Sequence, residues 1–188
     1  MPITALDPRT ALVVIDLQGG IRAASKAPGI DEVVAKSAEL AAAFRSRGLP
    51  VVLVNVDGGV SSRTDRTPVA PGPREFPPGF ADLLPELGRH GDDILVTKRT
   101  WGAFHGTDLD AKLRDAGVTG IVIAGVATTA GVESSARAAH EHGYNVTFAT
   151  DAMTDGDPVA HQNSVERIFP KIGETATTDE ILAVLAAS

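Results

Sequence analysis

The sequence predicts an α/β protein of three layers, α/β/α, with a central parallel sheet of about six strands. Short runs rich in Val, Ile, Leu and Phe alternate with longer amphipathic stretches, which is the pattern of consecutive βαβ units. The first run, Ala11-Leu-Val-Val-Ile, is apolar at every position, as in a strand covered by helices on both faces. The length of 188 residues suits one hydrophobic core, so we expect a single domain over residues 1–188.

Each strand is predicted where residues with high β propensity cluster. In chain order these strands are Ala11–Ile15, Pro50–Val56, Asp93–Lys98, Gly120–Ala124 and Asn145–Thr150, with a short sixth at Gly173–Thr177. Helices are predicted in the intervals, where apolar residues recur at helical spacing between capping residues and glycines. They are Asp31–Arg47, Thr107–Ala116 with Thr107 as N-cap, Gly131–His142, Pro158–Phe169 and Thr178–Ala187.

Charge and composition exclude several function classes. Seventeen Lys and Arg against 24 Asp and Glu give a net charge of −7, which repels nucleic acids and anionic lipid surfaces. We therefore expect no nucleic-acid and no membrane partner. The first residues lack a basic segment followed by an apolar run, so we expect a cytoplasmic protein. The chain has no cysteine, which rules out disulfides, thiolate metal sites and a cysteine nucleophile.

The sequence also lacks the common cofactor and hydrolase motifs. It has no G-x-G-x-x-G after a strand, no P-loop and no G-x-S-x-G elbow, so dinucleotide, nucleotide and serine-hydrolase sites are not expected. His140 and His142 are two positions apart, and on a helix they point to different faces and cannot chelate together. We expect neither a cofactor nor a metal.

Candidate ligand-binding residues stand at the ends of the first five predicted strands, where a parallel sheet binds its ligands. They are Asp16, Asp57, Lys98, Gly125 and Asp151. A single residue of this kind usually caps a helix or faces water, but acids and a lysine at one edge favour a ligand site. The long segment Asp57–Pro78 adds Arg63, Arg66 and Arg74. This segment is either a solvated loop or a lid that brings a guanidinium to a carboxylate.

Three segments carry a family resemblance. Thr10-Ala-Leu-Val-Val-Ile-Asp-Leu-Gln, Lys98-Arg-Thr-Trp-Gly-Ala-Phe and Gly125-Val-Ala-Thr-Thr-Ala-Gly-Val-Glu-Ser follow in this order. Together they resemble the isochorismatase-like hydrolase family, whose superfamily includes nicotinamidases and other cysteine amidohydrolases. The resemblance covers nearly the whole chain. It implies a Rossmann-like fold, hydrolase activity, and assembly as a homodimer or homotetramer.

The resemblance also assigns roles to residues. It implies that Asp16 is the acid/base residue and that Lys98 binds or stabilises the negative end of the reacting group. The third motif normally presents a cysteine, and in this chain that nucleophile position falls on Gly131. Family members that cleave the vinyl ether of isochorismate resemble this chain in having glycine there. Their reaction needs a proton donor and water but no covalent nucleophile.

We therefore predict acid-catalysed hydrolysis of a small anionic molecule, a carboxylate-bearing vinyl ether such as isochorismate or an aminated relative. Burial of Asp16 would favour its protonated form and Lys98 would oppose it, so the direction of the net pKa shift is left open. The alternatives are another small-molecule hydrolase, amide hydrolysis by water that Asp16 activates, and a small-acid-binding protein without catalysis.

Further site residues follow from position in the motifs. The resemblance implies a cis peptide bond between Val126 and Ala127, and the helix from Gly131 would direct its positive end at an anionic ligand. The substrate-binding candidates are Gln18, Trp101, Phe104, Val126, Ala127 and Thr128. Core packing is the competing interpretation for Trp101 and Phe104, and loop support for Gln18.

Two departures from the family pattern bear on the substrate. The residues Val56-Asp-Gly-Gly lack the Asp-x-His metal motif of the nicotinamidases. Ala127 and Thr129 stand where isochorismatases tend to have an aromatic residue and a histidine.

Overall fold

Six parallel strands form one sheet in the order β5-β2-β1-β6-β7-β8. The computed structural model describes residues 3–61, 63–65, 72–73 and 75–187. The strands are β1 Thr10–Ile15, β2 Val51–Val56, β5 Ile94–Lys98, β6 Gly120–Val126, β7 Asn145–Thr154 and β8 Glu174–Ala176. The chain order of the strands reverses between β1 and β6, which makes the end of this pair the topological switch point where such sheets bind ligands.

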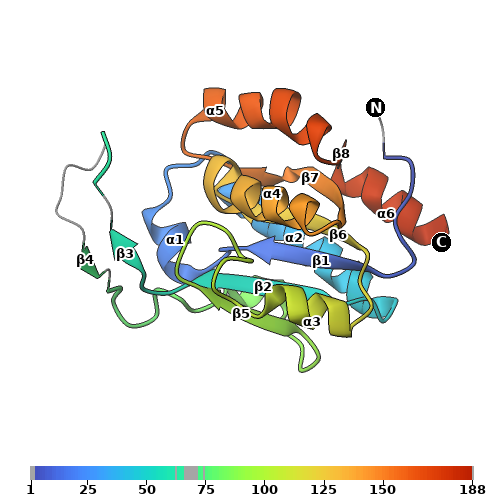
Figure 1. Ribbon diagram of the computed structural model, residues 1–188, viewed down its shortest axis with the longest axis horizontal. Coiled ribbons are helices and arrows are strands. Elements are labelled where there is room, and N and C mark those ends of the chain that lie inside the picture. The colour runs from blue at the N-terminus through green and yellow to red at the C-terminus, as the bar shows by residue number, and fades with distance from the viewer. Residues whose placement is uncertain (1–2, 62, 66–71, 74, 188) are drawn as a thin grey trace.

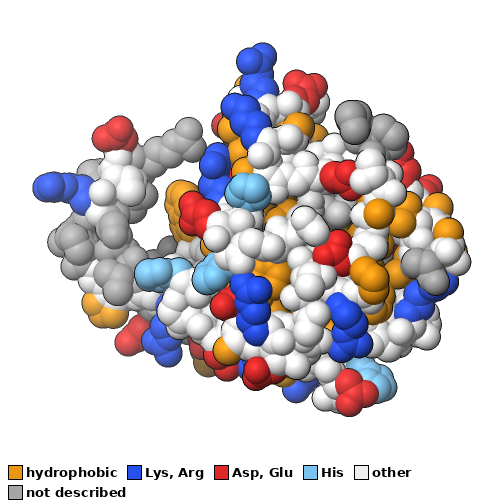
Figure 2. All heavy atoms as spheres, turned by 45° about the vertical axis from the view of Figure 1, so that its right-hand side comes forward, with side chains coloured by type: hydrophobic (Ala, Val, Ile, Leu, Met, Phe, Trp, Pro, Cys, Tyr) orange, Lys and Arg blue, Asp and Glu red, His pale blue; other side chains and the backbone are white. Residues whose placement is uncertain are grey.

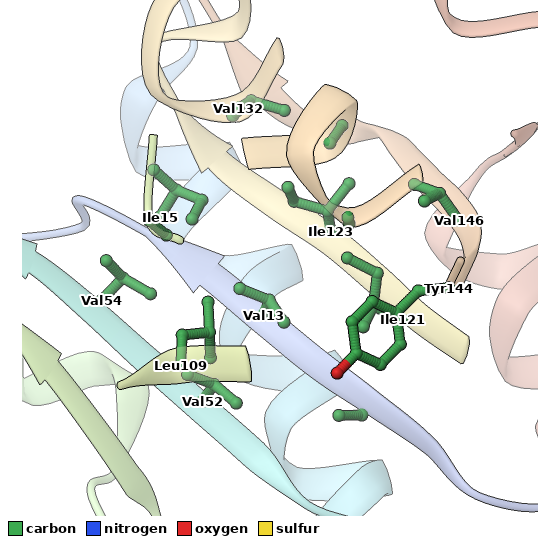
Figure 3. Packing of buried hydrophobic residues seen from close by; sticks show 14 of the residues in the cluster. Val13, Ile15, Val52, Val54, Leu109, Ile121, Ile123, Val132, Tyr144 and Val146 are labelled. Carbon is green, nitrogen blue, oxygen red and sulfur yellow. The ribbon is translucent and has the colours of Figure 1, made fainter. Parts of the chain in front are cut away.

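Helices cover both faces of the sheet, which confirms the three-layer prediction (Figure 1). The helices are α1 Gly19–Ala24, α2 Ile30–Ser46, α3 Leu109–Asp115, α4 Glu133–Glu141, α5 Pro158–Asn163 and α6 Thr178–Ala187. Val13 and Ile15 of β1 pack in the same hydrophobic cluster as residues of α3 and α4. Figure 3 shows this cluster where β1 lies between its neighbouring strands β2 and β6. Leu12 and Val14 pack on the opposite face, in the same cluster as residues of α2 and α6. Burial on both faces explains why β1 is apolar throughout.

Two strands end later than predicted, and this moves one candidate residue. β6 continues to Val126, and β7 continues to Thr154 instead of Thr150. Asp151 therefore lies within β7 and not at its end. Its Oδ1 accepts hydrogen bonds from the amide and hydroxyl of Thr178, and its Oδ2 is 2.9 Å from Nζ of Lys36. These contacts make Asp151 a cap for α6, where an acidic group stabilises the helix N-terminus.

Three helix predictions need correction. The helix predicted from Gly131 begins at Glu133, after a π-helical turn over Thr128–Val132. The helix predicted over Pro158–Phe169 is α5, followed by a π-helical turn over Ser164–Ile168 and a 3₁₀ turn over Phe169–Lys171. The N-cap of α3 is Asp108 and not Thr107; the Thr107 hydroxyl donates to the carbonyl of Ala103 and accepts from the amide of Leu109 at 3.3 Å.

Some elements were not predicted. These are α1, a 3₁₀ turn over Pro85–Leu87, and the short antiparallel strands β3 Val60–Ser61 and β4 Gly72–Pro73. The β3–β4 pair lies within the predicted loop Asp57–Pro78 and extends away from the sheet (Figure 1). Arg63 is exposed, whereas Arg66 and Arg74 lie outside the described residues. Within the described ranges, no helix combines the length and the apolar character that crossing a bilayer requires.

Candidate active site

A buried ion pair lies at the carboxyl end of the sheet. Asp16 directly follows β1, and Lys98 is the last residue of β5, two strands away. Nζ of Lys98 donates to Oδ2 of Asp16 at 2.7 Å and to the carbonyl of Thr100 at 3.1 Å. Asp16 is 6% exposed and Lys98 2% exposed. The sheet therefore brings together the acid and the lysine that the sequence predicted for one site.

The backbone of Asp16 adopts an uncommon conformation. Its φ of 54° lies in the left-handed region, and no other non-glycine residue does so within the part of the chain that the structure describes. The Asp16 amide donates to the carbonyl of Val54 at 2.9 Å, which keeps this residue aligned with β2. Aspartate tolerates this region better than most residues, and conformations of this kind concentrate at functional sites.

Burial makes the carboxyl group of Asp16 a weaker acid than an exposed aspartate. Burial raises the pKa of Asp16 from 3.8 to about 6, although the nearby Lys98 ammonium lowers it. The pKa shift that the sequence left open is therefore upward. Oδ1 of Asp16 is buried and has no hydrogen-bond partner among the residues that the structure describes. Because Oδ2 already accepts from Lys98, a proton on this carboxyl group would sit on Oδ1.

The turn after β6 approaches Asp16 closely. Gly125 has a φ of 112°, and a Cβ there would lie 2.1 Å from the carbonyl oxygen of Ile15, so only glycine fits between β6 and β1. The peptide bond between Val126 and Ala127 is cis, as predicted. A Cβ built on Gly131 would lie 3.3 Å from Oδ2 of Asp16. The predicted nucleophile position thus adjoins the carboxyl group and carries no side chain.

Buried polar contacts hold this turn in place. The amide and the hydroxyl of Thr129 donate to Oδ2 of Asp155 at 2.8 and 2.7 Å. The hydroxyl of Thr128 is hydrogen-bonded to Nδ1 of His161 at 2.9 Å. Thr128 is fully buried and supports the turn. Asp155 is not among the predicted site residues, because the fifth strand is predicted to end at Thr150; β7 in fact ends at Thr154, which places this acid directly after the strand.

A cavity of about 350 Å³ lies beside Asp16. Its wall is formed by the end of β1, the turn after β6, the end of β7, and the segment that links α1 to α2. The lining residues are Asp16, Ile21, Ala24, Ser25, Lys26, Ala27, Val126, Ala127, Ala130, Gly131, Thr154 and Gly156. The predicted residues Val126, Ala127 and Gly131 are among them. The α1–α2 segment was missed, and its only signal in the sequence was its position directly after the first strand.

Several predicted site residues lie outside this lining. Gln18 is fully buried, and its amide group bonds the backbone of Val56 and the carbonyl of Phe80, which agrees with the loop-support interpretation. Phe104 packs in the core, with its ring centroid 6.0 Å from that of Tyr144. Trp101 is 68% exposed and therefore does not pack in the core.

The other strand-end acid, Asp57, is exposed and does not line the cavity. No cluster of three or more His, Asp or Glu side chains suited to a metal ion occurs among the residues that the structure describes.

The sequence matches the Isochorismatase domain family over residues 10–180. It is 43% identical over 180 residues to the uncharacterized isochorismatase family protein YecD of Escherichia coli O157:H7, covering 94% of this chain and 96% of that one. It is 28% identical over 188 residues to the maleamate amidohydrolase of Pseudomonas putida, covering 94% and 87% of the two chains. The solved structure of an isochorismatase family protein from Burkholderia thailandensis superposes with a TM-score of 0.89, at 43% identity and 98% coverage of both chains.

Proposed function

The chain belongs to the isochorismatase family, and from this premise we propose that it hydrolyses a small, carboxylate-bearing vinyl ether by acid catalysis at Asp16. Isochorismate or an aminated relative has the required chemistry. The observation that carries the proposal is the state of Asp16. Its unpartnered Oδ1 and its raised pKa occur beside a cavity in which the nucleophile position is glycine.

The reaction requires protonation of a carbon atom, addition of water and collapse of the resulting hemiketal. Asp16 donates its proton to the terminal carbon of the vinyl ether, and the resulting oxocarbenium ion is stabilised by its ether oxygen. Water adds to the cationic carbon and loses a proton to the Asp16 carboxylate. The hemiketal then collapses: its hydroxyl proton passes to the departing ether oxygen, the bond between carbon and that oxygen breaks, and an alcohol and a 2-keto acid are released. No step forms a bond to the protein.

Lys98 makes the proton donor more acidic than burial alone would leave it. Its ammonium holds Oδ2, which leaves Oδ1 as the site of protonation and stabilises the carboxylate that forms after proton transfer. With a pKa of about 6, about a tenth of Asp16 is protonated at pH 7. A general acid works best when its pKa is near the working pH.

Amide hydrolysis is the second candidate, favoured by the similarity to maleamate amidohydrolase. The carboxylate of Asp16 would activate water for attack on the amide carbon. We rank this reaction lower because expelling an amine requires more activation than one carboxylate and one lysine provide. Binding of a small acid without catalysis is the third candidate.

Steady-state turnover of isochorismate, followed by pyruvate release, tests the proposal with wild type and Asp16→Asn side by side. We expect Asp16→Asn to abolish turnover while it still binds the substrate. In the wild type, kcat/KM should fall about tenfold per pH unit above pH 6, because only the protonated acid reacts. Turnover that survives in Asp16→Asn would contradict the mechanism. Turnover of maleamate but not of isochorismate would favour amide hydrolysis, and turnover of neither would favour the binding protein.

A further inference from the structure

We propose that Lys26, on the segment between α1 and α2, binds a carboxylate of the ligand and makes the Asp16 cavity selective for small carboxylates over neutral molecules. This inference deepens the proposed function and rests on it for the location of the reacting group beside Asp16. It assigns the anion-binding role to a different lysine from the one that the sequence resemblance implied.

Lys98 is poorly placed to bind a substrate carboxylate. Its ammonium already donates to Oδ2 of Asp16 and to the carbonyl of Thr100. It is 2% exposed and does not line the cavity. An ammonium has three donors, and two of them are committed to the protein. Because Lys98 is buried and does not line the cavity, its third donor is not presented to a ligand there.

Lys26 has the opposite properties. Among the described residues that line the cavity, only Asp16 and Lys26 carry charged side chains. Lys26 is exposed, and no carboxylate within the described ranges pairs with it. Lys36 and Lys112, in contrast, form ion pairs with Asp151 and Asp108. The ammonium of Lys26 is therefore available to a ligand.

The backbone that carries Lys26 is held against the cavity. The hydroxyl of Thr154, at the end of β7, donates to the carbonyl of Pro28 at 2.7 Å. The amide of Ala27 donates to the hydroxyl oxygen of Ser25 at 3.0 Å. Ser25 also lines the cavity, and its own hydroxyl proton remains available as a second donor. Only the side chain of Lys26 has to be ordered when an anion binds.

The charge of the whole protein does not attract anions. The net charge is −7, and on the face shown in Figure 2 basic and acidic side chains are interspersed. A local cation is therefore needed for an anion to enter. An anion held at Lys26 would in turn disfavour the carboxylate form of Asp16 and so favour the proton donor.

Direct binding of benzoate and of benzamide tests the inference without any turnover. The two probes share a ring and a size but differ in charge. We expect the wild type to bind benzoate more tightly than benzamide by isothermal titration, with benzoate affinity weakening as salt rises. Lys26→Met should weaken benzoate about tenfold to a hundredfold, as expected for loss of a hydrogen bond to a charged group. Benzamide affinity should not change.

Two variants make the result specific. Lys171→Met removes another exposed lysine that does not line this cavity, and it should leave benzoate binding unchanged. Lys26→Arg should restore the preference for benzoate and its salt dependence. Equal affinity of Lys26→Met and wild type for benzoate, or no preference of the wild type for benzoate, would overturn the inference.

The binding test is separate from the test of the proposed function. If Lys26→Met loses benzoate binding and the wild type turns over no vinyl ether, the anion site stands and the proposed reaction fails. If isochorismate is turned over with an unchanged KM in Lys26→Met, the reaction stands and the anion site fails.

Discussion

The raised pKa of Asp16 predicts that this residue destabilises the folded protein as pH rises. The pKa of Asp16 is about 6 in the folded protein and 3.8 for the model carboxyl group. Between these values the folded protein binds more protons than the unfolded chain, so the free energy of unfolding falls as pH rises. The contribution of Asp16 is fully present below pH 3.8 and is lost as pH rises through about 6.

The size of the effect follows from the same two pKa values. Each pKa unit corresponds to about 1.4 kcal/mol, so the loss between pH 3.8 and 7 is about 3 kcal/mol. Asparagine has nearly the same shape and does not titrate. We therefore expect the unfolding free energy of the wild type, minus that of Asp16→Asn, to decrease by about 3 kcal/mol over this range. Urea denaturation at each pH measures both proteins, and the subtraction cancels the titrating groups that do not interact with Asp16.

Lys98→Met provides the second arm of the experiment. Removing the ammonium should raise the pKa of Asp16 further, by about one to three pH units. The decrease in unfolding free energy should then continue above pH 7. Asp92→Asn, at an exposed side chain, controls for the loss of one surface carboxyl group. A flat or rising difference between wild type and Asp16→Asn would refute the reasoning, because it would mean that Lys98 outweighs burial.

Two substitutions test the packing around the site. Gly131→Ala should lower the unfolding free energy by about 1 kcal/mol and reduce turnover, because its Cβ would lie 2.9 Å from Cγ2 of Ile15 and 3.3 Å from Oδ2 of Asp16. Thermal unfolding measures the effect, with Gly91→Ala as the control because Gly91 has open space around it. Equal effects of the two substitutions would count against the prediction. Gln18→Ala should cost about 3 kcal/mol, since three backbone groups lose their partner; a loss below about 1 kcal/mol in urea denaturation would contradict this role.

The strands and their layers could be predicted because their signal is local. Residues of β1 and β6 are buried on both faces of the sheet, and such strands are apolar at consecutive positions. Strand ends were less accurate. Thr150 and Asp151 are polar, which predicts the end of a strand, but their side chains bond to β8 and α6. A polar residue that is satisfied by a distant element cannot be distinguished from a loop residue by its neighbours in sequence.

The roles of the two lysines show the same limit at the candidate site. Lys98 ends a strand within a recognisable motif, so the sequence predicted that it lies near Asp16, and it does. Whether its ammonium faces the cavity or lies behind the carboxyl group depends on β5 being two strands from β1, which no local pattern encodes. Lys26 belongs to no motif, and it reaches the cavity because Thr154 fixes the loop that carries it. A lysine that tunes an acid and a lysine that binds an anion differ in burial and in hydrogen-bond partners. Both properties are set by contacts between residues far apart in the chain, so the assignment of anion binding to Lys26 required the folded structure.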